Sequence, residues 1–337
     1  MEKTAMKVGH IPSLTWNRLE ANEGTAPAGL AASLDVETRF EKLPEGVTHC
    51  RMSGKEAAKW LEKYAPEEKA EAIVAGKVPI YHPQRFGTGL GAEYDAFLEK
   101  SGTVYEMLEV APDTRCEEPV VWSVDFYDGN EASQGQLIRV GENSHLTLLL
   151  RAASGSKEKG TAAFSMKIIL EKGASLFLVK AQILGEGYTF LDDTGAALAE
   201  GASMKMVQIE LGGGRVYIGT QPELIGDRSS FEAHAGYLGN DRKAIDVNYN
   251  AIQRGRRTDV KMSFDGVLKD RSEKAFRGTI DFRKGSKGSK GDEQENVLLL
   301  SDDVVNKTLP IILCEEEDVE GRHGASIGQL DDDILFY

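Results

Sequence analysis

The chain has 337 residues, of which 41% are hydrophobic and 28% are charged, so it can bury a substantial core in one large domain with a smaller one beside it. Its formal net charge of −14 would repel a phosphate backbone or an anionic membrane over most of the surface. No stretch approaches the roughly 20 apolar residues of a membrane span. Composition therefore argues against nucleic-acid and membrane partners.

The three cysteines, Cys50, Cys116 and Cys314, lie far apart and form no Cys-x-x-Cys pair. Their odd number and their spacing argue against a disulfide framework and against a four-thiolate zinc site. Because free thiols persist in a reducing compartment, we expect a cytoplasmic protein.

Residues 1–104 are typical of a helical segment with long loops. In the stretch from Lys55 to Val74, apolar residues recur near helical spacing among lysines and glutamates, and Pro66 is expected to interrupt them. The stretch from Tyr94 to Lys100 predicts a second short helix.

From residue 105 onward, short runs of alternating apolar residues are divided by turns, and one unit recurs: a small-residue turn, a serine, then alternation. Its serines are Ser144, Ser175, Ser203 and, more weakly, Ser229, which are 31, 28 and 26 residues apart. A drifting period of this size favours a β-solenoid, in which each turn buries its inner face on the next. An ordinary β-sandwich, whose strands also recur with regular turns, stays open as the alternative.

Acidic residues occur in adjacent groups, as in Asp192-Asp193 and in the run from Glu315 to Asp318. Two carboxylates at a suitable separation cleave glycosidic bonds, so a carbohydrate-active β-helix enzyme using paired carboxylates is the alternative function. Adjacent acids on a strand point to opposite faces, however, and an acidic chain produces such runs by composition. The loop from Gly155 to Thr161 has the outer spacing of a phosphate loop but carries Thr161 in place of its lysine, so we expect no ATP binding there.

His323 stands out among the histidines because Gly321, Gly324 and Gly328 surround it and permit close approach of a ligand or partner. Neutral imidazole is a good ligand for iron or zinc. The residues alone leave open whether His323 is a ligand or a surface bystander. Cys314 lies nine residues upstream, a spacing that fits no standard metal motif, and within its apolar run it is expected to be a small buried residue or a ligand from an adjacent turn.

A set of ordered motifs lies along the chain, most of them near its end. The last group consists of the run from Leu298 to Asp302, Pro310, Val319, His323-Gly324-Ala325, the run from Ile327 to Asp331 and Leu335-Phe336-Tyr337. Upstream of it lie Ser263, Gly266-Val267-Leu268, the run from Phe276 to Ile280 and, near the start, the run from Thr15 to Leu19. In order and spacing these motifs resemble the SufB/SufD family of iron–sulfur cluster assembly proteins: the last group is similar to its C-terminal signature, and Thr15 to Leu19 resembles a SufD-type opening. The resemblance covers the chain from about residue 105 to its end, with weaker support before it.

This resemblance implies a mainly β fold: a right-handed parallel β-helix core over residues 105–328, after the helical segment 1–104 and before a truncated C-terminal helical region beginning at residues 329–337. It also implies a non-enzymatic assembly component that works with a SufB-like scaffold and a SufC-like ATPase, so that ATP is hydrolysed by another subunit. SufD is the partner of SufB and is linked to iron supply. The expected cargo is a transient iron ion or cluster at a subunit interface, with no tightly bound cofactor.

Individual positions indicate the SufD-like branch. Where SufB carries a sulfur-accepting cysteine, this chain reads Glu293 to Asn296, and His-Gly-Ala at His323 is the SufD form. The cysteine that SufD often has two residues before this histidine is replaced by Gly321. His323 is therefore the candidate iron ligand and Cys314 a secondary one.

Two further expectations concern partners. The chain stops at Tyr337, where the family continues into helices that dock SufC, so either SufC binding is altered or the sequence is a truncated form. An edge strand of the β-helix would accept either a SufB-like protein or a second copy of this chain.

Overall fold

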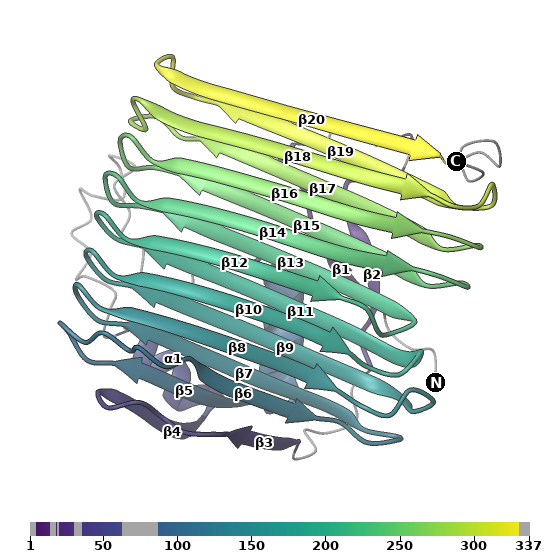
Figure 1. Ribbon diagram of the computed structural model, residues 1–337, viewed down its shortest axis with the longest axis horizontal. Coiled ribbons are helices and arrows are strands. Elements are labelled where there is room, and N and C mark those ends of the chain that lie inside the picture. Colours follow the sequence, from purple (N-terminus) through teal and green to yellow (C-terminus); the bar gives the residue numbers. More distant parts are fainter. Residues whose placement is uncertain (1–4, 14–17, 19, 30–35, 63–86, 330–337) are drawn as a thin grey trace.

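The computed structural model describes residues 5–13, 18, 20–29, 36–62 and 87–329 of the chain. Within these ranges the chain is mainly β-strand and contains two short helices, α1 (Gly54–Glu62) and α3 (Ala92–Lys100). The strands stack as a solenoid of about 8 turns. Figure 1 shows β3 (Glu37–Phe40) and β4 (Val47–Ser53) at one end of the stack and β19 (Val305–Cys314) and β20 (Val319–Gln329) at the other. No helix in the described ranges has the length and apolar character needed to cross a membrane.

Two nine-stranded sheets form the coil. The first sheet contains β3 (Glu37–Phe40), β6 (Val120–Asp125), β8 (His145–Ala153), β10 (Ser175–Ile183), β12 (Ser203–Glu210), β14 (Ser230–Gly239), β16 (Asp259–Leu268), β18 (Ser289–Leu299) and β20 (Val319–Gln329). The second sheet contains β4 (Val47–Ser53), β5 (Val104–Val110), β7 (Glu131–Val140), β9 (Lys159–Leu170), β11 (Gly187–Leu198), β13 (Arg215–Leu224), β15 (Ala244–Gln253), β17 (Glu273–Phe282) and β19 (Val305–Cys314).

Each turn of the coil contributes one strand to each sheet, and neighbouring strands from β5 to β20 pair in parallel. The alternation of side chains places every second residue between the sheets. In β8, for example, Leu146, Leu148 and Leu150 are buried while the residues between them are partly exposed. These inward residues form one core that runs along the coil, and each fully buried leucine contributes roughly 1.5–3 kcal/mol to folding.

The corners that precede the first-sheet strands are built alike. Most of them contain one residue with a positive φ, such as Asn143 (φ 55), Gly173 (φ 66) and Gly201 (φ 65). Their backbones are linked from turn to turn, because Asn143 N–H donates to Lys172 O at 2.9 Å and Gly173 N–H to Glu200 O at 2.9 Å. Glycine adopts this left-handed conformation without the steric cost that a side chain would add.

The N-terminal segment closes one end of the coil and covers the outer face of the second sheet. Strands β3 and β4 pair antiparallel with β6 and β5. Helix α1 packs through Trp60 and Leu61 on second-sheet residues that include Leu137. The two-stranded sheet of β1 (Ala5–Val8) and β2 (Gly24–Pro27) packs together with α3 against Leu191 of β11.

The solenoid prediction is confirmed, and both expected helices are present where the structure describes the chain. The serine repeat is confirmed at its centre but slips by one residue at its ends: Ser175 aligns with Ser203, whereas the aligned residues on either side are His145 and Ser230. The aligned positions His145, Ser175, Ser203 and Ser230 are 30, 28 and 27 residues apart, because the corner loops differ in length.

The division of the chain into an N-terminal segment, residues 1–104, and a β-helix core that follows it stays a prediction. Strands β1–β4 lie within this N-terminal segment. Residues 63–86 lie outside the described residues, and so does most of the SufD-type opening from Thr15 to Leu19. The same is true of residues 330–337, which contain the expected start of the C-terminal helical region.

Candidate functional site

The coil ends in an uncovered turn made of β19 and β20 (Figure 1). Strand β20 pairs with β18 along one edge, and in the described part of the chain no strand pairs with its other edge. Every residue of β20 after Val319 is exposed. A free strand edge of this kind presents unpaired backbone donors and acceptors to another chain.

His323 lies in the middle of β20 and aligns with Glu293 of β18. Aligned residues of parallel strands point to the same face, and Glu293 is buried between the sheets. His323 therefore lies on the inner side of its sheet, at the open end of the coil. The inward positions beside it, Gly321 and Ala325, have small or no side chains, which leaves the imidazole accessible.

Cys314 is the last residue of β19 and is exposed, so the expectation of a buried residue is wrong. It aligns with the fully buried Phe282 of β17, but among the described residues no further strand lies beyond β19 in its sheet. Its thiol donates to the carbonyl oxygen of Glu316 at 3.0 Å, within the corner that leads to β20. His323 lies four residues after Val319, the first residue of β20, and a strand advances by about 3.3 Å per residue. Among the described residues no group of three or more His, Cys, Asp or Glu side chains is placed to hold a metal ion.

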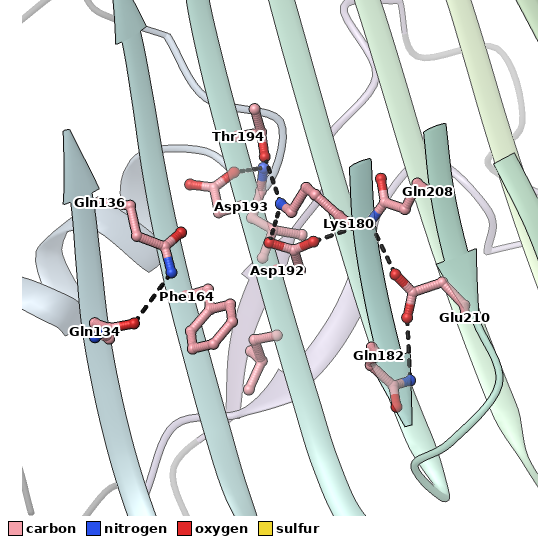
Figure 2. Close-up of polar contacts among 12 residues, drawn as sticks. Gln134, Gln136, Phe164, Lys180, Gln182, Asp192, Asp193, Thr194, Gln208 and Glu210 are labelled. Carbon is pink, nitrogen blue, oxygen red and sulfur yellow. Dashed lines mark hydrogen bonds and ion pairs between the residues drawn. The ribbon is translucent and has the colours of Figure 1, made fainter. Parts of the chain in front are cut away.

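A group of polar side chains crosses the interior of the coil between β10, β11 and β12 (Figure 2). The ammonium of Lys180 lies 2.5 Å from Asp192 Oδ1 and donates to Thr194 Oγ1 at 3.0 Å. Gln208 Nε2 donates to Asp192 Oδ2 at 2.9 Å and to Glu210 Oε1 at 2.9 Å. Burial of such a network is tolerated because nearly every polar atom finds a partner.

Burial changes the acidity of this interior network. It raises the pKa of Glu210 to about 7, with the nearby charge of Asp192 acting in the same direction. Burial lowers the pKa of Lys243 to about 8, and the charge of Glu210 opposes that change. The network borders a cavity of about 10 Å³ between Lys180, Phe164 and Phe190, which holds at most about one water molecule.

A second polar group lies nearer the open end. Glu295 accepts from Lys274 Nζ at 2.6 Å, from Tyr237 Oη at 2.8 Å and from Thr308 Oγ1 at 2.6 Å. Glu293 precedes it by two residues on the same face of β18, and burial together with the charge of Glu295 raises the pKa of Glu293 to about 8. The interior of the coil is thus polar in several places, which also include Gln134 and Gln136 of β7, and the group around Glu295 lies directly below the turn that carries His323.

The paired acids do not form a glycosidase-like site. Asp192 faces the interior, whereas Asp193 faces outward and accepts from the backbone N–H of Leu90 at 2.7 Å, so the two point to opposite faces as expected. Glu315 and Glu316 accept hydrogen bonds from Arg283 and from the Gly285 backbone in an exposed corner. An open groove at the other corner of the coil has no aromatic residue to stack on a sugar and is lined by Asp241, Arg242, Asp270, Arg271, Ser301, Asp302 and Asp303.

Sequence reasoning missed the interior polar residues, although a signal for them exists. In Leu176-Phe177-Leu178-Val179-Lys180-Ala181-Gln182, Lys180 and Gln182 continue the inward alternation of the leucines. Polar residues at inward positions of a strand predict a buried network rather than a solvated face. The same parity places Glu293 and Glu295 inside.

The fold and its open end define a parallel β-solenoid with an apolar core, buried polar groups within it and a terminal strand that is unpaired among the described residues. Residues 127–337 match the family model described as SUF system FeS cluster assembly, SufBD core domain. The chain is 23% identical over 235 residues to the iron–sulfur cluster assembly protein SufD of Bacillus subtilis (strain 168), a match that covers 68% of this chain and 53% of that protein. It is also 23% identical over 240 residues to the SufBD family protein ycf24 of Antithamnion sp., covering 68% of this chain and 80% of the relative.

The chain belongs to the SufBD family of iron–sulfur cluster assembly proteins. The resemblance found in the sequence, SufD-like in type, is thereby confirmed. The match spans about half the length of the Bacillus subtilis protein.

Proposed function

We propose that the chain is a non-enzymatic, SufD-like component of a cytoplasmic iron–sulfur cluster assembly complex, and that it assists iron delivery or cluster assembly on a SufB-like scaffold. The observation that carries this proposal is the terminal strand β20, which is exposed along its length and carries His323 at the open end of the coil. The free thiols of Cys50, Cys116 and Cys314 suit a reducing compartment.

The free edge of β20 supports pairing with a second β-helix. Such an edge bonds through backbone groups, and the residues that line it decide which partner is accepted. A SufB-like scaffold is the proposed partner. A second copy of this chain would use the same strand on both sides of a two-fold axis.

Hydrolysis of ATP is assigned to a separate SufC-like subunit. In the loop from Gly155 to Thr161, the backbone N–H of Gly155 donates to the carboxylate of Glu158 at 2.7 Å. An acid therefore occupies the place where a phosphate loop would offer its amides to an anion.

Iron is the cargo of the complex, and His323 contacts it while the partner is docked. An imidazole nitrogen suits ferrous iron, and His323 is exposed where the partner would meet it. Cys314 is the secondary candidate, because its exposed thiol lies in the corner that leads into β20.

The test is to reconstitute the chain with a SufB-like protein and a SufC-like ATPase, and to compare His323→Ala with the parent for iron content and rate of cluster formation. We expect both to fall with His323→Ala while the complex still co-purifies. His234→Ala is the matched control, because His234 is an exposed histidine on β14, outside the last turn. Unchanged iron content and assembly rate in His323→Ala would refute the ligand role.

A further inference from the structure

Glu293 is a buried carboxyl group that its surroundings leave incompletely bonded. Only 1% of the residue is exposed, and its Oε2 atom has no hydrogen-bond partner among the described residues. Its neighbour Glu295, on the same face of β18, accepts from three donors. The nearby ammonium of Lys274 is bonded to Glu295 and Thr308, so that cation does not neutralise Glu293.

The interior around Glu293 is shaped to leave its carboxyl group free. A side-chain carbon placed on Gly278 of β17 would lie 2.2 Å from Glu293 Oε1, so a side chain at that point would displace the carboxyl group. The aligned residue on β19 is Pro310, whose side chain has no hydrogen-bond donor. Glycine and proline together line this level of the interior without offering a hydrogen-bond donor from a side chain.

Glu293 is also the residue directly beneath His323. The two are aligned in the parallel pairing of β18 and β20, and adjacent strands lie about 4.8 Å apart. Their side chains leave the same face of the sheet, with the buried Glu293 one strand below the exposed His323. In the described part of the chain no strand lies beyond His323, since β20 is the last strand of its sheet.

A carboxyl group is costly to bury in its charged form unless it is paired or binds a cation, and otherwise it holds its proton. A carboxylate oxygen and an imidazole nitrogen together form a donor set suited to ferrous iron, and both types of group are found in mononuclear iron sites. The pair leaves most of the coordination positions of iron unfilled.

We propose that Glu293 and His323 bind one ferrous ion together at the open end of the coil, Glu293 from inside and His323 from the terminal strand. Water or a docked partner supplies the remaining ligands. This inference rests on the proposed function, and it adds an interior residue that moves the iron from the rim of the interface into the mouth of the coil.

The test is anaerobic titration calorimetry of the full chain with ferrous ion alone, comparing the parent with Glu293→Gln, His323→Ala and the double variant. We expect each single substitution to weaken iron binding at least tenfold and the double variant to weaken it little further, because both ligands serve one ion. The matched control is Asp292→Asn, which removes the adjacent carboxylate on the other face of β18 and should bind iron like the parent.

Glu293→Gln keeps the shape of the side chain, and urea unfolding should show it to be at least as stable as the parent. Gly278→Ala provides a second route, since it displaces the carboxyl group without removing either ligand, and it should weaken iron binding as well. If Glu293→Gln binds iron like the parent while His323→Ala does not, the inference fails and the proposed role of His323 stands. If neither variant changes iron binding, the iron role of both residues fails, and pairing with the scaffold is judged separately by co-purification.

Discussion

Lys180 and Asp192 form an ion pair in the middle of the coil, with exposed fractions of only 4% and 1% for their side chains. We predict that Lys180→Met destabilises the protein by about 3–5 kcal/mol, because it leaves the charge of Asp192 buried without its ammonium partner. Urea unfolding followed by circular dichroism measures this. Lys205→Met is the control: the Lys205–Glu232 pair is exposed, and such pairs contribute about 0–1 kcal/mol. A loss below about 1 kcal/mol for Lys180→Met would contradict the prediction.

Glu210 makes the stability of the coil depend on pH. Its pKa is raised from 4.5 to about 7 by burial, so between these values the folded chain holds a proton that the unfolded chain has released. Stability from this group is therefore complete below pH 4.5 and is lost as the pH rises to about 7. The loss amounts to about 3 kcal/mol, since each pKa unit corresponds to about 1.4 kcal/mol.

Glu210→Gln should remove that part of the pH dependence. The glutamine amide has no proton to release, so the free energy of unfolding should fall less between pH 5 and 7 in the variant than in the parent. Urea unfolding at several pH values measures the difference. Glu232→Gln, at a partly exposed site on β14, is a control that should keep the parental slope over this range. Equal slopes for Glu210→Gln and the parent would show that Glu210 does not bind the proton.

At the scale of elements, the segment of residues 87–100, which ends in α3, is held on the outside of the second sheet by close backbone contacts. A side-chain carbon on Gly89 would lie 1.9 Å from the backbone nitrogen of Thr220 in β13. The side-chain amide of Asn248 donates to Gly89 O at 2.8 Å, and Asp193 accepts from the next residue, Leu90. This segment is therefore fitted to the surface of the coil rather than loosely tethered to it.

Gly89→Ala should lift this segment from the sheet. Backbone cannot move as a flexible side chain does, so we expect the amides of residues 87–100 to exchange with deuterium at least tenfold faster in the variant. Gly29→Ala is the matched control, because nothing lies within 4 Å of the carbon it would add. Parental exchange in Gly89→Ala would mean that the close packing on β13 does not hold the segment.

The elements differ in how far the sequence predicts them. The coil is predictable because its alternation of apolar residues and its turns repeat along the chain. Such a repeated signal survives a one-residue error in alignment, as at Ser144, where His145 is the residue that aligns with Ser175. Strands β3 and β4 carry no such repeat, since they cap the first turn once and pair antiparallel. His323 could be proposed from its glycine-rich setting, but its alignment with Glu293 could not, because that alignment depends on the register of β18 and β20.

For the whole molecule, the decisive asymmetry is that one end of the core is capped while, among the described residues, no strand covers the other. Phe40 of β3 packs on Trp122 at the first end, with ring centroids 4.7 Å apart. At the other end Ile327 aligns with the buried Val297, yet it is 54% exposed. An exposed apolar residue that continues the core column suits the partner interface proposed above.

Ile327→Lys should therefore abolish pairing with a SufB-like partner while leaving the fold intact. A charge pointing inward from an edge strand blocks strand addition, and the residue is already more than half exposed, so little burial is lost within the chain. We expect at least a tenfold loss of affinity, about 1.4 kcal/mol, in size-exclusion and calorimetric assays of the mixed proteins. The control is Ile183→Lys, which places the same charge on a residue that is 45% exposed on β10, far from the open end along the stack of strands. If Ile327→Lys pairs as well as Ile183→Lys does, the partner docks elsewhere and the open end of the core is completed by some other part of the assembly.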